Sequence, residues 1–178
     1  MKALPRRFYA RPTIDVSRDL LGKVVAHGKT SGRIIEVEAY LGVDDLAAHS
    51  ARGITNRTRV IFGPPGHAYV YLIYGMYECL NVVAEPDGTP GCVLIRALHP
   101  LTGIEQMRDR RRGQQDLAGG PGKLTQALGI TRALNGADVT RGPLCILDAG
   151  PRNGEILVTP RIGISQAADL PLRFVLVS

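Results

Sequence analysis

The 178-residue sequence has no tryptophan and only three cysteines, at positions 79, 92 and 145. The cysteines form no C-x-x-C pair, which argues against a disulfide framework and a thiolate zinc site. We therefore expect all three to be small buried side chains. The longest apolar segment without a charge, residues 69–74, is too short to cross a bilayer, and nothing resembles a signal peptide. These absences predict a soluble, intracellular protein with no membrane partner.

The residues that are abundant are apolar and basic. Hydrophobic residues make up 44% of the chain and charged residues 21%, as expected for one globular domain over residues 1–178. Lysine and arginine number 22 against 16 acidic residues, which gives a net charge of +6. Basic groups placed near phosphates release condensed counterions, so this imbalance favours a polyanionic partner.

Hydrophobic alternation and turn residues divide the chain into short elements. Strands are predicted at residues 23–27, 33–40, 68–73, 78–83, 92–98, 144–149, 155–164 and 172–177. Helices are predicted at residues 16–21, 101–112 and 123–128. Asp15 is the expected N-cap of the first helix, which Gly22 would close. Residues 42–66 lack periodicity and end in Gly-Pro-Pro-Gly, which predicts a long surface loop.

The strand at residues 33–40 carries two acids. Period-two alternation puts Ile35, Val37 and Ala39 on one face, and Ile34, Glu36, Glu38 and Tyr40 on the other. A carboxylate beside an aromatic wall can activate water, provided that burial does not protonate it. Taken alone, the pattern also fits an exposed strand face with solvated acids.

The hairpin at residues 68–83 holds four of the six tyrosines of the chain. Tyr69, Tyr71 and Ile73 face one way, whereas Tyr74 and Met76 stand at the tip. An ordinary cross-strand cluster in the core remains an alternative for Tyr69 and for Tyr77. An aromatic tip that points into water is harder to explain as packing.

Several motifs resemble, in order, those of the alkyladenine (3-methyladenine) DNA glycosylase family. They cover residues 32–42, 47–50, 62–66, 69–77, 92–98, 120–124 and 160–164. The resemblance implies that Glu38 is the general base that deprotonates the attacking water. It also implies that Arg96 and the backbone carbonyl of Ile162 help to hold that water.

The resemblance implies a pocket for a flipped base. Tyr40, His49 and Tyr71 would form its walls, and His49 would also offer a hydrogen bond. Asn81 would lie at the floor, where its amide would oppose the exocyclic amine of normal guanine. Purines alkylated at N3 or N7 are cationic, and an aromatic face attracts a cation, so Tyr40 and Tyr71 would favour such damaged bases over normal ones.

The remaining implied roles concern the duplex. Tyr74, together with Met76, would be the wedge that fills the space left by the extruded nucleotide. Lys123, at a helix start, would contact a phosphate. Glu36 is expected to support the structure rather than to catalyse.

We therefore expect an α+β fold, with a mainly antiparallel curved sheet around a base-binding pocket, short peripheral helices and a protruding hairpin. The expected function is monofunctional base excision repair of alkylation and deamination damage in double-stranded DNA. Expected substrates are 3-methyladenine, 7-methylguanine, hypoxanthine and etheno-adducts. No lysine lies in the strand motifs, which predicts hydrolysis without a Schiff base. We expect a cytoplasmic monomer, nucleoid-associated in a bacterium, that uses no metal and no cofactor.

Two alternatives from other classes stay open. A non-catalytic nucleic-acid-binding module would stack single-stranded bases on Tyr71 and Tyr74, with Glu38 merely solvated. A nucleoside hydrolase would act on free nucleosides and would need neither the wedge nor the basic surface. An assay that compares duplex and nucleoside substrates separates these alternatives.

Overall fold

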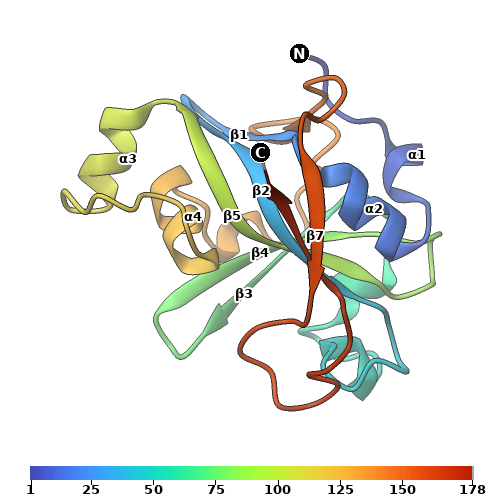
Figure 1. The fold of residues 1–178 in the computed structure, drawn as a ribbon. Helices are drawn as coiled ribbons and strands as arrows, with labels where there is room; N and C mark the ends of the chain where they lie inside the picture. Colours follow the sequence, from blue (N-terminus) through green and yellow to red (C-terminus); the bar gives the residue numbers. More distant parts are fainter. Residues whose placement is uncertain (178) are drawn as a thin grey trace.

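Strand β2 (Thr30–Tyr40) runs through the centre of one antiparallel sheet in the computed structural model, which describes residues 1–177 (Figure 1). One edge of β2 pairs with β5 (Cys92–Thr102) along nearly its whole length. Its other edge is shared, because β1 (Val24–His27) pairs with its first residues and β8 (Arg173–Val177) with residues 36–38. The sheet thereby branches beside Glu36 and Glu38.

The remaining strands extend this sheet on both sides. Within the described residues, the strand order is β3–β4–β5–β2–β1–β6, and β7 joins through β8. The bounds of these further strands are Ala68–Ile73 for β3, Tyr77–Val83 for β4, Leu144–Leu147 for β6 and Glu155–Thr159 for β7. The curved antiparallel sheet with few short helices confirms the predicted α+β class and single domain.

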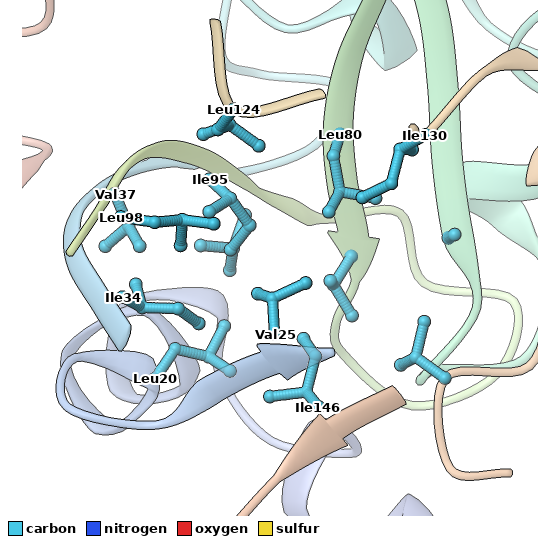
Figure 2. Close-up of a cluster of buried hydrophobic side chains, with 14 of the residues drawn as sticks. Leu20, Val25, Ile34, Val37, Leu80, Ile95, Leu98, Leu124, Ile130 and Ile146 are labelled. Carbon is cyan, nitrogen blue, oxygen red and sulfur yellow. The ribbon is translucent and has the colours of Figure 1, made fainter. Parts of the chain in front are cut away.

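A bulge in β2 changes the predicted alternation. The register between β2 and β5 shifts between Ile34 and Glu36 and again before Val37. An extra residue in one strand reverses which face the following side chains take. Ile34 therefore lies in the same core cluster as Val37 and Ala39, as Figure 2 shows for Ile34 and Val37. The prediction that Ile34 shares a face with Glu38 was wrong.

The helices flank the sheet at two ends (Figure 1). Their bounds are Arg6–Tyr9 for α1, Thr13–Leu20 for α2, Ile104–Arg110 for α3 and Pro121–Leu128 for α4. The first predicted helix starts earlier than expected, because the Glu85 carboxylate accepts hydrogen bonds from the N–H and Oγ1 of Thr13 at 2.6 and 2.8 Å. A side chain distant in sequence thus replaces Asp15 as the cap.

Two other boundaries differ from prediction for local reasons. β5 extends to Thr102, so α3 begins only after Gly103, whose φ is +71°. The strand predicted at residues 155–164 stops at Thr159, because Pro160 has no N–H to donate and Gly163 has a φ of +74°. The predicted loop at residues 42–66 contains two 3-10 helices, η1 (His49–Arg52) and η2 (Arg59–Phe62). A third, η3, spans Arg132–Leu134.

The two faces of the sheet carry different clusters. On one face, Leu80, Val82, Val93 and Ile95 join the main apolar core, whose centre Figure 2 shows. On the other face, a small separate cluster consists of Ile61, Tyr69, Val83 and Cys92, with Tyr40 and Tyr71 packed against it. Alternation along β4 and β5 therefore directs every second side chain away from the core.

None of the cysteines forms a disulfide within residues 1–177. Cys79 and Cys92 are buried as expected, but Cys145 is only half-buried because its strand lies at the margin of the sheet. Across the part of the chain that the structure describes, no helix is both long and apolar enough to span a membrane. In the same residues, no three histidine, cysteine or acidic side chains gather in a way that would hold a metal ion.

Candidate active site

A cavity of about 700 Å³ opens on the sheet face opposite the main core. Strands β3, β4 and β5 form one side of it. The end of β2, the loops near His49 and Ile162, the start of α4 and the segment after α3 form the rest. The side chains that line it include the predicted site residues Tyr40, His49, Tyr71, Tyr74, Asn81, Arg96, Lys123 and Ile162. The structure thus brings these residues together from segments scattered over the whole sequence.

Aromatic rings form the deep wall of this cavity. The rings of His49 and Tyr71 lie 4.6 Å apart at an interplanar angle of 67°, and those of Tyr69 and Tyr71 lie 5.3 Å apart. The Tyr69 hydroxyl and His49 Nδ1 share a hydrogen bond of 2.9 Å. Burial, together with the nearby charges of Arg57 and Arg52, lowers the pKa of His49 to about 4. The imidazole is therefore neutral at physiological pH.

Asn81 is buried at the cavity lining, between the aromatic wall and β5. Its Nδ2 donates to the backbone oxygen of Tyr69 at 3.2 Å, and its Oδ1 lies 3.9 Å from the thiol of Cys92. One of the two amide N–H groups is engaged by this contact, which fixes the orientation of the side chain.

Glu38 is fully buried directly behind the cavity wall. Its Oε2 accepts a 2.9 Å hydrogen bond from the Tyr40 hydroxyl, and its Oε1 accepts a 2.8 Å bond from the N–H of Ile162. A terminal nitrogen of Arg96 lies 3.4 Å from Oε1. These donors compensate for burial of the carboxyl group. Burial and the neighbouring Glu38 raise the pKa of Tyr40, which keeps its hydroxyl protonated as a donor.

The backbone of Ile162 contacts Glu38 directly, because its N–H donates to Oε1. The role that the resemblance implies for the carbonyl of Ile162, that of holding the water, stays a prediction. The Ile162 side chain is 48% exposed and lines the cavity.

The charge of Arg96 inside an apolar strand has a structural explanation. Its Nε donates to Glu36 Oε1 at 2.9 Å, and Arg173 Nε donates to the same oxygen at 2.7 Å. Burial alone would raise the pKa of Glu36, but hydrogen bonds from Arg173 and Arg96 lower it below the usual value. Glu36 therefore holds Arg96 beside Glu38, in keeping with the supporting role predicted for it.

A buried ion pair that sequence reasoning missed lies next to Tyr40. The two terminal nitrogens of Arg161 contact the two Asp45 oxygens at 2.6 and 2.8 Å, and both side chains are almost completely buried. Arg161 also donates to the backbone oxygen of Ala39 at 3.0 Å. This bidentate pair ties the segment that carries Ile162 to the end of β2. The only sequence signal was the position of Arg161 beside Ile162 in a family motif.

The hairpin tip borders the cavity through Tyr74, which is one of its lining residues, whereas Met76 is not. Tyr74 is 78% exposed with a φ of +54°, and Met76 is 66% exposed. This confirms that the tip points into solvent. Of the two tyrosines whose role was left open, Tyr69 is buried in the small cluster and Tyr77 is half exposed at the cavity rim.

Lys123 lies near the start of α4, where its Nζ contacts Asp116 Oδ2 at 2.6 Å. The sequence indicated the lysine but not its acidic partner. Both side chains are about half exposed, so a phosphate oxygen can compete with the carboxylate for the ammonium group.

The chain is similar to known proteins over almost its whole length. The family model described as methylpurine-DNA glycosylase (MPG) matches residues 7–178. A protein of Methanocella arvoryzae named "Putative 3-methyladenine DNA glycosylase" is 52% identical, over 97% of this chain and 90% of its own. Proteins with the same name from Methanoculleus marisnigri and Legionella pneumophila strain Lens are 53% and 48% identical, over 97% and 98% of this chain and 94% of each relative.

These matches place the chain in the class of DNA glycosylases. It belongs to the methylpurine-DNA glycosylase family, which confirms the resemblance identified from its sequence motifs.

Proposed function

We propose that this protein flips alkylated or deaminated purines out of duplex DNA and hydrolyses their glycosidic bonds. The observation that carries the proposal is Glu38, a buried carboxyl group in contact with three residues that line an aromatic cavity. The volume of the cavity, about 700 Å³, is within the range of small-molecule sites. A glycosidic carbon is inaccessible inside a duplex, so a reaction in this cavity requires an extruded nucleotide.

In the proposed reaction, Glu38 accepts a proton from water. The water oxygen forms a bond to C1′ of the sugar while the bond from C1′ to the base nitrogen breaks, and the base leaves with that electron pair. A carboxylate oxygen has about two acceptor positions. Ile162 and Arg96 approach Oε1, whereas Tyr40 alone approaches Oε2. Oε2 therefore keeps an acceptor position for the water.

Selection of the base would depend on the cavity wall. A flipped purine would stack against Tyr71 and Tyr40, and the neutral His49 would hydrogen bond to its edge. The unengaged N–H of Asn81 would oppose the exocyclic amine of guanine, since two donors that face each other leave both unsatisfied. Normal guanine would thereby be disfavoured.

A panel of duplexes that each contain one lesion tests the proposal. The protein is expected to release 3-methyladenine, 7-methylguanine, hypoxanthine or etheno-adenine as free base, and to leave an intact abasic strand. Measured rates on the matching free nucleosides are expected to be much lower. Binding without release of any base would support a non-catalytic module, and equal rates on nucleosides would support a nucleoside hydrolase.

Tyr74→Ala tests the wedge. Because aromatic–base stacking contributes about 1–3 kcal/mol, we expect a loss of roughly tenfold or more in release from duplex substrates. Turnover of the same lesion as a free nucleoside is expected to be unchanged, which provides the internal control. Since Tyr74 is largely exposed, the midpoint of urea unfolding should stay at the wild-type value. An equal loss on both substrates would contradict the wedge assignment.

A further inference from the structure

A guanidinium group covers each of the two tyrosines proposed to stack on the base. The central carbon of Arg161 lies 4.8 Å from the centroid of the Tyr40 ring, and that of Arg57 lies 5.1 Å from the Tyr71 ring. Neither arginine lines the main cavity. Arg57 instead lines a smaller hollow of about 330 Å³ beside β3, and Tyr69 and Tyr71 line both this hollow and the main cavity.

The two arginines differ in how far their charges are neutralised. Arg161 is buried and paired through both terminal nitrogens with Asp45. Arg57 is exposed and takes part in no ion pair within residues 1–177. Its charge contributes, after burial, to the lowered pKa of His49 on the cavity side. Because Tyr71 and His49 both line the main cavity, the guanidinium of Arg57 lies close to the proposed position of the base.

We propose that Arg57 is a specificity-determining residue that acts through Tyr71 to favour neutral lesions over cationic ones. This inference rests on the proposed function, because it requires a purine against the cavity face of Tyr71. A cation binds an aromatic face through the negative charge of the π-system. When Arg57 already occupies one face, a cationic base on the other face gains less from the same ring and also meets a like charge across it.

Arg57 would weaken the preference for cationic bases that the aromatic wall alone would produce. Two tyrosines without arginines would favour cationic 3-methyladenine and 7-methylguanine over neutral hypoxanthine. With Arg57 in place, that preference is reduced, and neutral deaminated or etheno-modified purines become comparatively better ligands. An arginine that served only to bind phosphate would instead strengthen binding of both classes equally.

Equilibrium binding to duplexes that resist cleavage isolates this effect from the chemical step. A fluorine at C2′ of the lesion nucleotide destabilises the positive charge that develops on the sugar, so the wild-type protein, with Glu38 intact, can be used. One duplex carries 7-methylguanine and the other hypoxanthine in the same sequence. The measured quantity is the ratio of their two affinities, compared among the wild type, Arg57→Met, Arg57→Lys and Arg59→Met.

Arg57→Met is expected to shift the ratio about five- to tenfold toward 7-methylguanine, because the opposing charge is lost. Arg57→Lys keeps the charge and should leave the ratio within about twofold of wild type. Arg59→Met is the matched control, since it removes an exposed charge from the same loop, where Arg59 contacts Asn56 rather than a ring. It should weaken both complexes alike. A second readout, the NMR titration of His49, should show a higher pKa in Arg57→Met than in the wild type.

An unchanged ratio in Arg57→Met, or the same shift in Arg59→Met, would overturn the inference. A His49 titration that does not respond to Arg57→Met would also overturn it, since the charge would then not reach the cavity. Base release by the wild type from duplexes without the fluorine shows whether the role of Arg57 or the proposed function itself is wrong. If the wild type releases both bases while the ratio is unchanged, only the role of Arg57 is wrong. If the wild type releases neither base, the proposed function is wrong, and the inference is wrong with it.

Discussion

Glu38→Gln is expected to slow base release from a hypoxanthine-containing duplex by about 10²–10⁴-fold, the usual contribution of a general base. Glutamine has the same shape, and its carbonyl oxygen can still accept a hydrogen bond from Tyr40 or from the N–H of Ile162. It cannot take a proton from water. We therefore expect affinity for the lesion duplex to stay near wild type, as measured by fluorescence anisotropy, while single-turnover release nearly stops.

Glu36→Gln is the matched control for this prediction. It makes the same chemical change two residues away, on a carboxyl group that holds Arg96 and Arg173 but has no contact with Tyr40. Its effect on release should be much smaller than that of Glu38→Gln. Undiminished release in Glu38→Gln, or a larger loss in Glu36→Gln, would show that the general base has been assigned to the wrong carboxyl group.

Asp45→Ala is expected to have the largest effect on stability among single substitutions near the site. It leaves the buried guanidinium of Arg161 without its partner, and loss of one member of such a pair costs about 3–5 kcal/mol. The free energy of unfolding in urea measures this loss. Because Arg161 also anchors the segment of Ile162, base release should fall even at temperatures where the variant is fully folded.

The comparison variant for Asp45 is Asp19→Ala. Asp19 pairs with Arg11 at 2.9 Å on the surface, where both side chains are more than a third exposed, so we expect a loss of at most about 1 kcal/mol. Similar losses in the two variants would contradict the role given to the buried pair. Should Asp45→Ala not fold, Asp45→Asn offers a milder test, since the amide retains an oxygen acceptor.

The contribution of Asp45 to stability depends on pH. Burial would raise the pKa of this carboxyl group, but its hydrogen bonds with Arg161 and with backbone N–H groups lower it below the usual value. A lowered pKa stabilises the fold above the ordinary aspartate range, and this stabilisation is lost as the pH falls through the lowered value. The difference in stability between the wild type and Asp45→Asn should therefore be largest near neutral pH and shrink below about pH 4.

The local elements of the fold could be predicted because local chemistry determines them. Tyrosines and aliphatic residues alternate along β3, and the tight turn after Ile73 fixes the hairpin. The bulge in β2 could not be predicted, because it arises where β2 leaves β1 and takes up β8, a strand distant in sequence. The start of α2 was missed for the same reason, since Glu85 provides the cap.

The residues of the candidate site also fall into two groups. Sequence motifs identified the first group, and only the folded chain reveals the second. Tyr40, His49, Tyr71 and Arg96 were found because each stands in a motif that resembles the family, and the structure brings them to one cavity. Asp45 and Arg161 are separated by 116 positions, and no periodicity links them. Arg57 was missed because its contact with the Tyr71 ring forms only when the chain folds. Sequence patterns identify which residue types are present in a motif. Which charged side chains on distant loops come into contact can be seen only in the folded chain.

The division of the sheet into two faces has an evolutionary consequence. The main apolar core lies on one face, and most of the side chains proposed to recognise a lesion lie on the other. An exchange at a cavity position that is not fully buried, such as Tyr71 or Tyr74, therefore removes little of the packing on which folding depends. The proposed range of lesions can therefore change through single exchanges at such positions, without compensatory changes in the main core.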